Sequence, residues 1–94
     1  METQKLLAYF QAGQTAIIER IRQVVELEST SRDIPGNRLV IDWIEAEARK
    51  ISEDFIIERI FANGYGEHFI LRAFSSAEKP VLLLGHTDTV HPRG

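Results

Sequence analysis

The sequence predicts a three-layer α/β protein in which two N-terminal helices pack on a mixed sheet. Apolar residues recur with helical spacing in segments 6–27 and 38–52. Segments 55–61 and 68–74 are rich in β-formers and flank a glycine-containing turn. Residues 81–84 form a continuous apolar run, which is typical of a strand covered on both faces. We therefore expect a β-hairpin plus one buried strand beneath the two helices.

The first helix is expected over residues 6–27, whose apolar positions are spaced by three, four and seven residues. Gly13 falls in register with this apolar stripe, between Phe10 and Ile17. One continuous helix through Gly13 would cost about 1 kcal/mol relative to alanine at that position. A break near Gly13, giving two helices, is the alternative.

The second helix is expected over residues 38–52, after a connector at 28–37 that contains the turn-forming pair Pro35-Gly36. Asn37 is suited to cap its N-terminus, because an Asn side chain accepts hydrogen bonds from early helical N–H groups. Trp43 fits the buried face and is expected to have a core role. The predicted buried positions are Val40, Trp43, Ile44, Ala48 and Ile51.

The two β-rich segments are expected to form an antiparallel hairpin. The intervening residues include Asn63-Gly64, a pair that favours tight turns between strands. His68 begins the second segment and is expected to be an exposed strand residue.

Composition excludes several classes of protein. The chain has 94 residues and a net charge of −3, so no basic surface indicates nucleic-acid binding. It has no cysteine, which leaves His and carboxylates as the strong metal ligands. We see no secretory signal and no bilayer-spanning segment, and so expect a cytoplasmic protein without a membrane partner.

His86 and Asp88 follow the apolar run directly. Residues two apart in an extended chain face the same side, with Cα atoms roughly 6.6 Å apart. The two side chains could contact one ion, or the carboxylate could orient the imidazole through its second nitrogen. The simpler interpretation of these residues is a polar turn at the end of a strand.

Residues 82–90, Leu-Leu-Leu-Gly-His-Thr-Asp-Thr-Val, resemble the first metal motif of the M20 family of metallopeptidases. Within that family the nearest likeness is to the glutamate carboxypeptidase branch. Residues 24–31 are similar to the end of the family's first helix and its substrate-side loop, and segment 38–52 stands where its second helix stands. Where this chain has Glu53 or Asp54 after the second helix, the family often has a glycine. This difference affects how the helix ends and not the chemistry of the site.

The resemblance implies roles for individual residues. His86 matches the first His ligand of a two-zinc (Zn²⁺) site, and Asp88 matches the acid that contacts and tunes this ligand during catalysis. His91 is not supported as a ligand. The family's reaction is metal-assisted hydrolysis of an amide, in which a Glu takes a proton from the metal-bound water. It releases a C-terminal amino acid such as glutamate from a small peptide or N-acyl amino acid.

In the family, the bridging Asp, the Glu base, the remaining ligands and a dimerisation domain come after the position of Gly94. Residues 1–94 are therefore expected to be the N-terminal portion of the catalytic domain of a homodimeric parent, to be inert alone, and to risk aggregation. Two other interpretations stay open. One is a related aminoacylase or deacylase, and the other is a small non-enzymatic α/β binding module.

Overall fold

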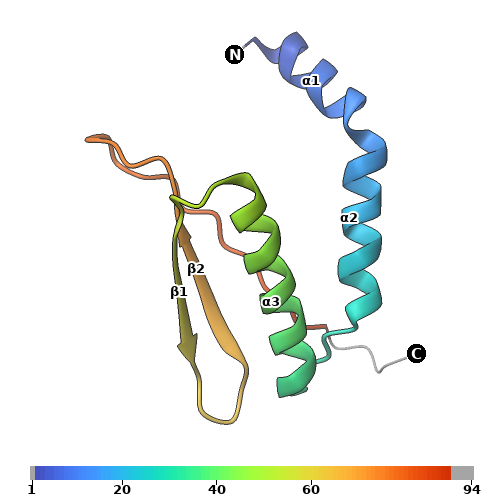
Figure 1. Ribbon diagram of the computed structural model, residues 1–94, viewed down its shortest axis with the longest axis vertical. Coiled ribbons are helices and arrows are strands. Elements are labelled where there is room, and N and C mark those ends of the chain that lie inside the picture. The colour runs from blue at the N-terminus through green and yellow to red at the C-terminus, as the bar shows by residue number, and fades with distance from the viewer. Residues whose placement is uncertain (1, 90–94) are drawn as a thin grey trace.

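The structure is a computed structural model that describes residues 2–89. It has the expected α/β class. Helix α3 lies between α2 on one side and a two-stranded hairpin on the other, and α1 extends away from this body (Figure 1). In chain order the elements are α1 (Thr3–Ala12), α2 (Gln14–Leu27), α3 (Ile34–Ile51), β1 (Ile56–Phe61) and β2 (Glu67–Arg72).

The N-terminal helical segment is divided at Gly13, in agreement with the two-helix alternative. Gly13 has φ −93° and ψ 7°, and it ends α1 and begins α2. Hydrogen bonding continues across the junction, from Gly13 N–H to Tyr9 O and from Ile17 N–H to Gly13 O. No residue of α1 is buried. Within residues 2–89, no helix combines the length and the apolar character needed to cross a bilayer.

Helix α3 begins four residues earlier than predicted, and Asp33 rather than Asn37 caps it. The Asp33 side chain accepts a hydrogen bond from Gly36 N–H at 3.0 Å. Pro35 lies in the first turn, where its fixed φ and missing N–H suit a helix start. The turn signal of Pro35-Gly36 therefore belongs to the beginning of α3, and Asn37 lies inside the helix.

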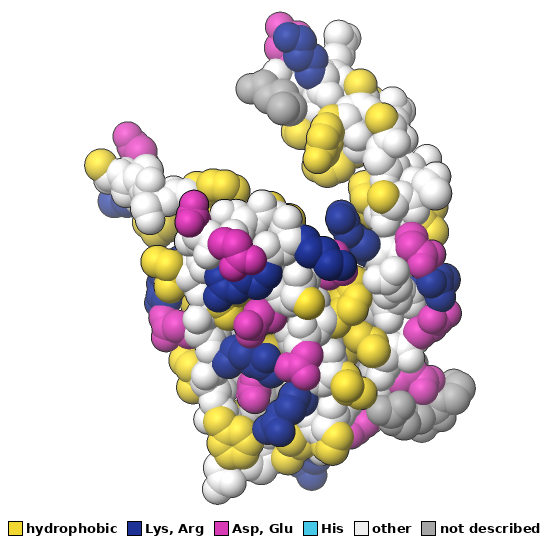
Figure 2. All heavy atoms as spheres, in the orientation of Figure 1, with side chains coloured by type: hydrophobic (Ala, Val, Ile, Leu, Met, Phe, Trp, Pro, Cys, Tyr) yellow, Lys and Arg dark blue, Asp and Glu magenta, His cyan; other side chains and the backbone are white. Residues whose placement is uncertain are grey.

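The core is small and centred on α3. Val40 and Ile41 are each only 2% exposed, and Ala48 is 7% exposed. Ile51, predicted to be buried, is 70% exposed because it ends the helix beyond the packed neighbours, whereas Ile41 was not predicted. The prediction for Trp43 fits its position: it is half-buried, and its Nε1 donates to Gln23 Oε1 on α2 at 3.1 Å. Hydrophobic side chains line this junction of α2 with α3 (Figure 2).

The predicted antiparallel hairpin is confirmed. Ile56 stands opposite Arg72 at one end of the ladder, and Phe61 stands opposite Glu67 at the other. Within the turn, Gly64 has φ +81°, a conformation that favours glycine. His68 is an exposed strand residue, as expected.

The prediction of a buried strand at residues 81–84 is wrong for this structure. These residues lie outside any strand, and the sheet has two strands among the described residues. Val81, Leu82, Leu83 and Leu84 are 81–90% exposed. Four large aliphatic side chains need cover on both faces to become buried, and the hairpin and α3 do not supply it. The three-layer arrangement is therefore not formed by residues 2–89 themselves.

Candidate metal site

The segment that carries His86 and Asp88 is held by the loop between α2 and α3. Ser31 N–H donates to Thr89 O, and Thr89 N–H donates to Ser29 O, each at 2.8 Å. These bonds form a short parallel bridge between Thr30 and Thr89. The loop is framed by left-handed residues, Glu28 at φ 52° and Arg32 at φ 68°. Backbone pairing therefore fixes the position of this segment, although the apolar run before it is exposed.

His86 turns one ring nitrogen toward its own chain. Its Nδ1 lies 2.9 Å from the Asp88 carbonyl oxygen and 3.3 Å from Asp88 Oδ1. Because a carbonyl oxygen can only accept, this contact requires the proton to be on Nδ1. The neutral ring then presents its lone pair on Nε2, and the His86 side chain is 83% exposed. Nε2 is therefore the ring nitrogen left available to accept a hydrogen bond or to bind a metal.

Asp88 is held on both carboxylate oxygens. Oδ1 faces His86, and Oδ2 accepts a hydrogen bond from Ser31 Oγ at 2.7 Å. The hydrogen bond from the Ser31 hydroxyl is the main reason that the pKa of the Asp88 carboxyl lies below its usual value. Burial opposes this effect, and a backbone hydrogen bond and the nearby imidazole lower the pKa further. Asp88 is therefore a carboxylate at neutral pH, suited to accept a hydrogen bond from an imidazole.

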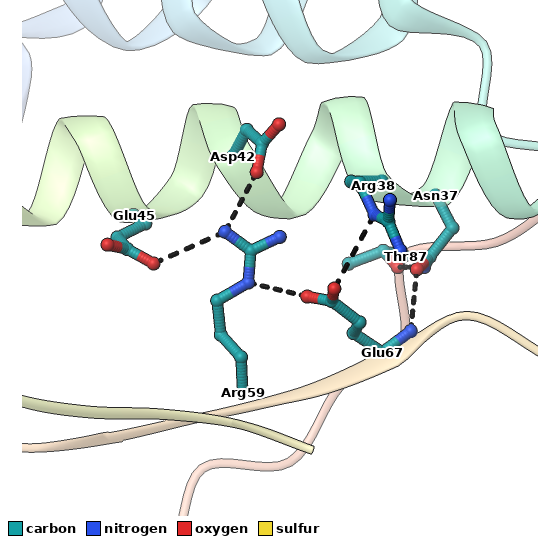
Figure 3. A network of polar contacts seen from close by, with 7 residues as sticks. All are labelled: Asn37, Arg38, Asp42, Glu45, Arg59, Glu67 and Thr87. Atoms are coloured by element: carbon teal, nitrogen blue, oxygen red, sulfur yellow. Dashed lines mark hydrogen bonds and ion pairs between the residues drawn. The ribbon is translucent and has the colours of Figure 1, made fainter. Parts of the chain in front are cut away.

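Thr87 contacts helix α3, whereas its neighbour Asp88 contacts the loop before that helix. Asn37 Nδ2 on α3 donates to Thr87 Oγ1 at 3.2 Å, and Asn37 Oδ1 accepts from Glu67 N–H at 2.9 Å (Figure 3). Successive side chains thus contact different partners, as in an extended chain. Asn37 joins α3, the start of β2 and the His86–Asp88 segment.

Arg59 of β1 occupies the neighbouring space between α3 and the hairpin. It pairs with Asp42 at 2.8 Å and with Glu45 at 3.3 Å on α3, and also with Glu67 (Figure 3). Burial alone lowers the Arg59 pKa, but the hydrogen bonds to these carboxylates together raise it above its ordinary value. Three carboxylates contact the guanidinium through Nε and Nη1, and we interpret this network as structural.

Among the described residues, the segment supplies one candidate ligand atom, His86 Nε2, and not a complete metal site. Within residues 2–89, no three His, Cys, Asp or Glu side chains gather closely enough to hold a metal ion. His68 lies on β2 as an exposed strand residue, and His91 and Val90 lie outside the described residues. His86 Nε2 fits one zinc ligand, and Asp88 fits the carboxylate behind it. A complete zinc site needs further ligands.

An open hollow adjoins the two residues. It has a volume of about 1150 Å³ and is bounded by α3, the hairpin and the segment ending at Asp88. His86, Asp88 and Tyr65 supply polar groups to its lining, and Ile41 and Phe69 supply apolar ones. The space is large enough for a small organic ligand.

Two residues of this arrangement were not predicted as parts of the site. Ser31 was placed in the connector, at the end of the segment likened to a substrate-side loop, but without a role of its own, and Asn37 was interpreted as a helix cap. Neither has a local pattern that indicates a contact with residues 87–88, because these contacts span 50 and 57 positions of the chain.

Comparisons of the chain with protein-family models, with curated proteins and with solved structures gave no match.

Proposed function

We propose that this chain forms the N-terminal part of the catalytic domain of an M20-type, zinc-dependent hydrolase. The reaction would be hydrolysis of an amide that releases a C-terminal amino acid such as glutamate. The observation that carries the proposal is the His86 ring, whose Nδ1 contacts Asp88 while Nε2 points away with its lone pair. This is the arrangement by which proteins prepare a histidine for zinc.

Each residue has a separate task in the proposal. His86 donates a lone pair through Nε2, and Asp88 holds the imidazole in the required tautomer and raises its basicity. Zinc, when bound, acidifies a water and polarises the substrate carbonyl. The adjoining hollow gives a small peptide or N-acyl amino acid access to both residues.

The proposal also concerns the parent, the longer protein of which residues 1–94 would be the N-terminal part. Residues 81–84 are apolar and exposed to solvent. In the parent, a larger sheet would include and cover them, which would give the three-layer arrangement. The remaining ligands, the Glu base and the second zinc position would come from other parts of that protein, which is proposed to be a cytoplasmic homodimer. Residues 1–94 alone are proposed to be inactive.

The test uses the full-length parent protein and replaces one histidine at a time. In His86→Ala we expect the zinc content to fall below the wild-type stoichiometry and hydrolysis of peptidyl and N-acyl glutamates to fall at least 100-fold, because a direct ligand is lost. The matched control is His68→Ala, which removes an exposed histidine from β2. Because His68 lies away from the His86–Asp88 pair, this variant should keep its zinc content.

Asp88→Asn separates the two roles within the site. The amide removes the negative charge behind the imidazole, so activity should fall about 10–100-fold while part of the zinc remains bound. A His86→Ala protein with normal turnover and a full zinc complement would refute the metal assignment. A parent that cleaves only N-acyl amino acids would be an aminoacylase of the same type.

A further inference from the structure

Arg32 occupies a backbone position that does not favour an arginine. Its φ is +68°, in the left-handed region, where glycine and asparagine are the usual residues. The residues on either side hold it there, because Ser31 N–H donates to Thr89 O at 2.8 Å. Asp33 N–H in turn donates to Thr30 O at 3.1 Å. The loop thus explains the conformation of this position, but not why its side chain is a guanidinium.

The Arg32 side chain has no partner within residues 2–89. It is exposed, and it forms no hydrogen bond or ion pair with any residue of this part of the chain. The other arginines described each contact a carboxylate or a main-chain carbonyl, and they are Arg20, Arg22, Arg38, Arg49, Arg59 and Arg72. The charge of Arg32 is therefore available to a ligand.

Arg32 lines the hollow that also contains His86, and it is the only arginine or lysine of that lining among the described residues. Three carboxylates line the hollow as well, and protein groups hold each of them. The start of α3 holds Asp33, two arginines hold Glu67, and a loop hydroxyl holds Asp88. The hollow therefore has one cation without a counter-charge, which an anionic group of a ligand could supply.

The loop also fixes Arg32 relative to His86. The parallel bridge joins Thr30, which shortly precedes Arg32, to Thr89, which shortly follows His86. Because this bridge consists of main-chain hydrogen bonds, it does not depend on the side chain of Arg32. A substitution at Arg32 can thus remove the charge while the loop and the His86 segment stay paired.

We propose that Arg32 binds a carboxylate of the substrate and makes the hollow selective for small molecules that carry one. A guanidinium and a carboxylate form paired, charge-assisted hydrogen bonds, which gives both affinity and direction. The identity of the ligand as an N-acyl or peptidyl amino acid rests on the proposed function. Recognition of a carboxylate rests on Arg32 and the hollow alone.

The test measures binding of N-acetylglutamate to the metal-free chain of 94 residues, by chemical-shift titration at constant ionic strength. The comparison ligand is the amide of N-acetylglutamine, which has the same carbon skeleton but no carboxylate. All samples carry Leu83→Lys, because Leu83 is 90% exposed, does not line the hollow, and a charge there limits self-association.

The expected result is saturable binding of N-acetylglutamate and about 10-fold weaker binding of the amide. Arg32→Asn should weaken binding of the acid about 10-fold, because a charged hydrogen-bond donor is lost. Asparagine accepts the left-handed conformation, so this variant should unfold at a temperature no lower than the wild type. The matched control is Arg22→Gln, which removes an exposed guanidinium of α2 outside the hollow and should bind as the wild type does.

In the full-length parent, Arg32→Asn should raise KM for N-acyl glutamates about 10-fold and leave kcat nearly unchanged, because the carboxylate contact does not change during the reaction. A folded Arg32→Asn chain with wild-type affinity for N-acetylglutamate would overturn the role of Arg32. Equal affinity of the wild type for the acid and the amide would do the same. A parent without hydrolase activity, combined with carboxylate binding that depends on Arg32, would overturn the hydrolase proposal and leave the role of Arg32 intact.

Discussion

Asn37 shows how a single side chain can organise this small protein. Its amide oxygen accepts from Glu67 N–H, and its amide nitrogen donates to Thr87 Oγ1. Gly66 lies directly against this amide, and a Cβ atom added there would overlap Asn37 Oδ1 and Cγ and approach its Cβ at 2.9 Å. The absence of a side chain at Gly66 is therefore what lets α3, the hairpin and the candidate site meet.

At the residue scale, Gly66→Ala should lower the free energy of unfolding by about 1–3 kcal/mol, because the Asn37 amide must move and leave the half-buried Glu67 N–H without its acceptor. Urea denaturation followed by tryptophan fluorescence measures the change. Gly85→Ala is the matched control, since a Cβ at Gly85 meets nothing within 4 Å. Equal stability of the two variants would contradict the packing of Gly66 on Asn37.

The helices differ in how they are stabilised. Helix α3 has a capped start and a buried face, whereas α1 has no buried residue and no side-chain cap. Isolated helices of this length are marginal in water. The division at Gly13 therefore leaves α1, the ten-residue piece Thr3–Ala12, dependent on its own propensity and on the junction with α2.

At the element scale, Gly13→Ala should increase helical content and stabilise the junction by about 0.5–1 kcal/mol, because alanine restricts the unfolded chain and favours the helix. The backbone at Gly13 has negative φ, and a Cβ there would lie at an ordinary 3.6 Å from Tyr9 O. Circular dichroism at 222 nm during thermal unfolding measures both effects.

Gly64→Ala provides the contrast for Gly13→Ala. Gly64 has φ +81°, a conformation that strains any residue with a Cβ, although a Cβ there would meet nothing within 4 Å. This variant should lose about 1 kcal/mol of stability. If Gly13→Ala also lost stability, the local geometry inferred for the α1–α2 junction would be incorrect.

At the scale of the molecule, residues 2–89 form a small core and leave many large apolar side chains exposed. Among the described residues, the largest fully buried side chains are Val40 and Ile41, while residues 81–84 and helices α1 and α2 present large aliphatic groups to solvent. On the face shown in Figure 2, basic and acidic side chains are interspersed over α3, so no field of one sign keeps copies of the chain apart there. Apolar segments of this kind favour association with other chains.

At the scale of the molecule, the 94-residue chain should self-associate, and Leu83→Lys should shift it toward monomer. Because Leu83 is 90% exposed, its replacement should change the free energy of unfolding by less than about 0.5 kcal/mol. Sedimentation velocity at several concentrations measures the association. Unchanged association in Leu83→Lys would exclude residues 81–84 as the contact.

Ile41 is only 2% exposed, so Ile41→Ala should instead lower the free energy of unfolding by about 2–5 kcal/mol.

Several elements could be predicted because their signals are local. The helical spacing in α2 and α3, the Asn63-Gly64 turn and the β-rich segments each act over a few residues, so the class and the hairpin follow from the sequence. The His86 and Asp88 pair was also found by spacing, and the structure brings the two side chains within 3.3 Å. Their role in binding zinc stays a prediction.

Other features depended on tertiary structure, since they need partners far away in the chain. Residues 81–84 have the pattern of a buried strand, but burial requires neighbours on both faces, and residues 2–89 supply none there. Asn37 has the chemistry of a cap, yet Asp33 occupies that role and Asn37 reaches Thr87 instead. Ser31 contacts Asp88 across 57 positions only because the loop and the final segment pair through their backbones. Local propensity thus determined the helices and the hairpin, whereas packing decided that residues 81–84 form no strand here and which distant side chains meet.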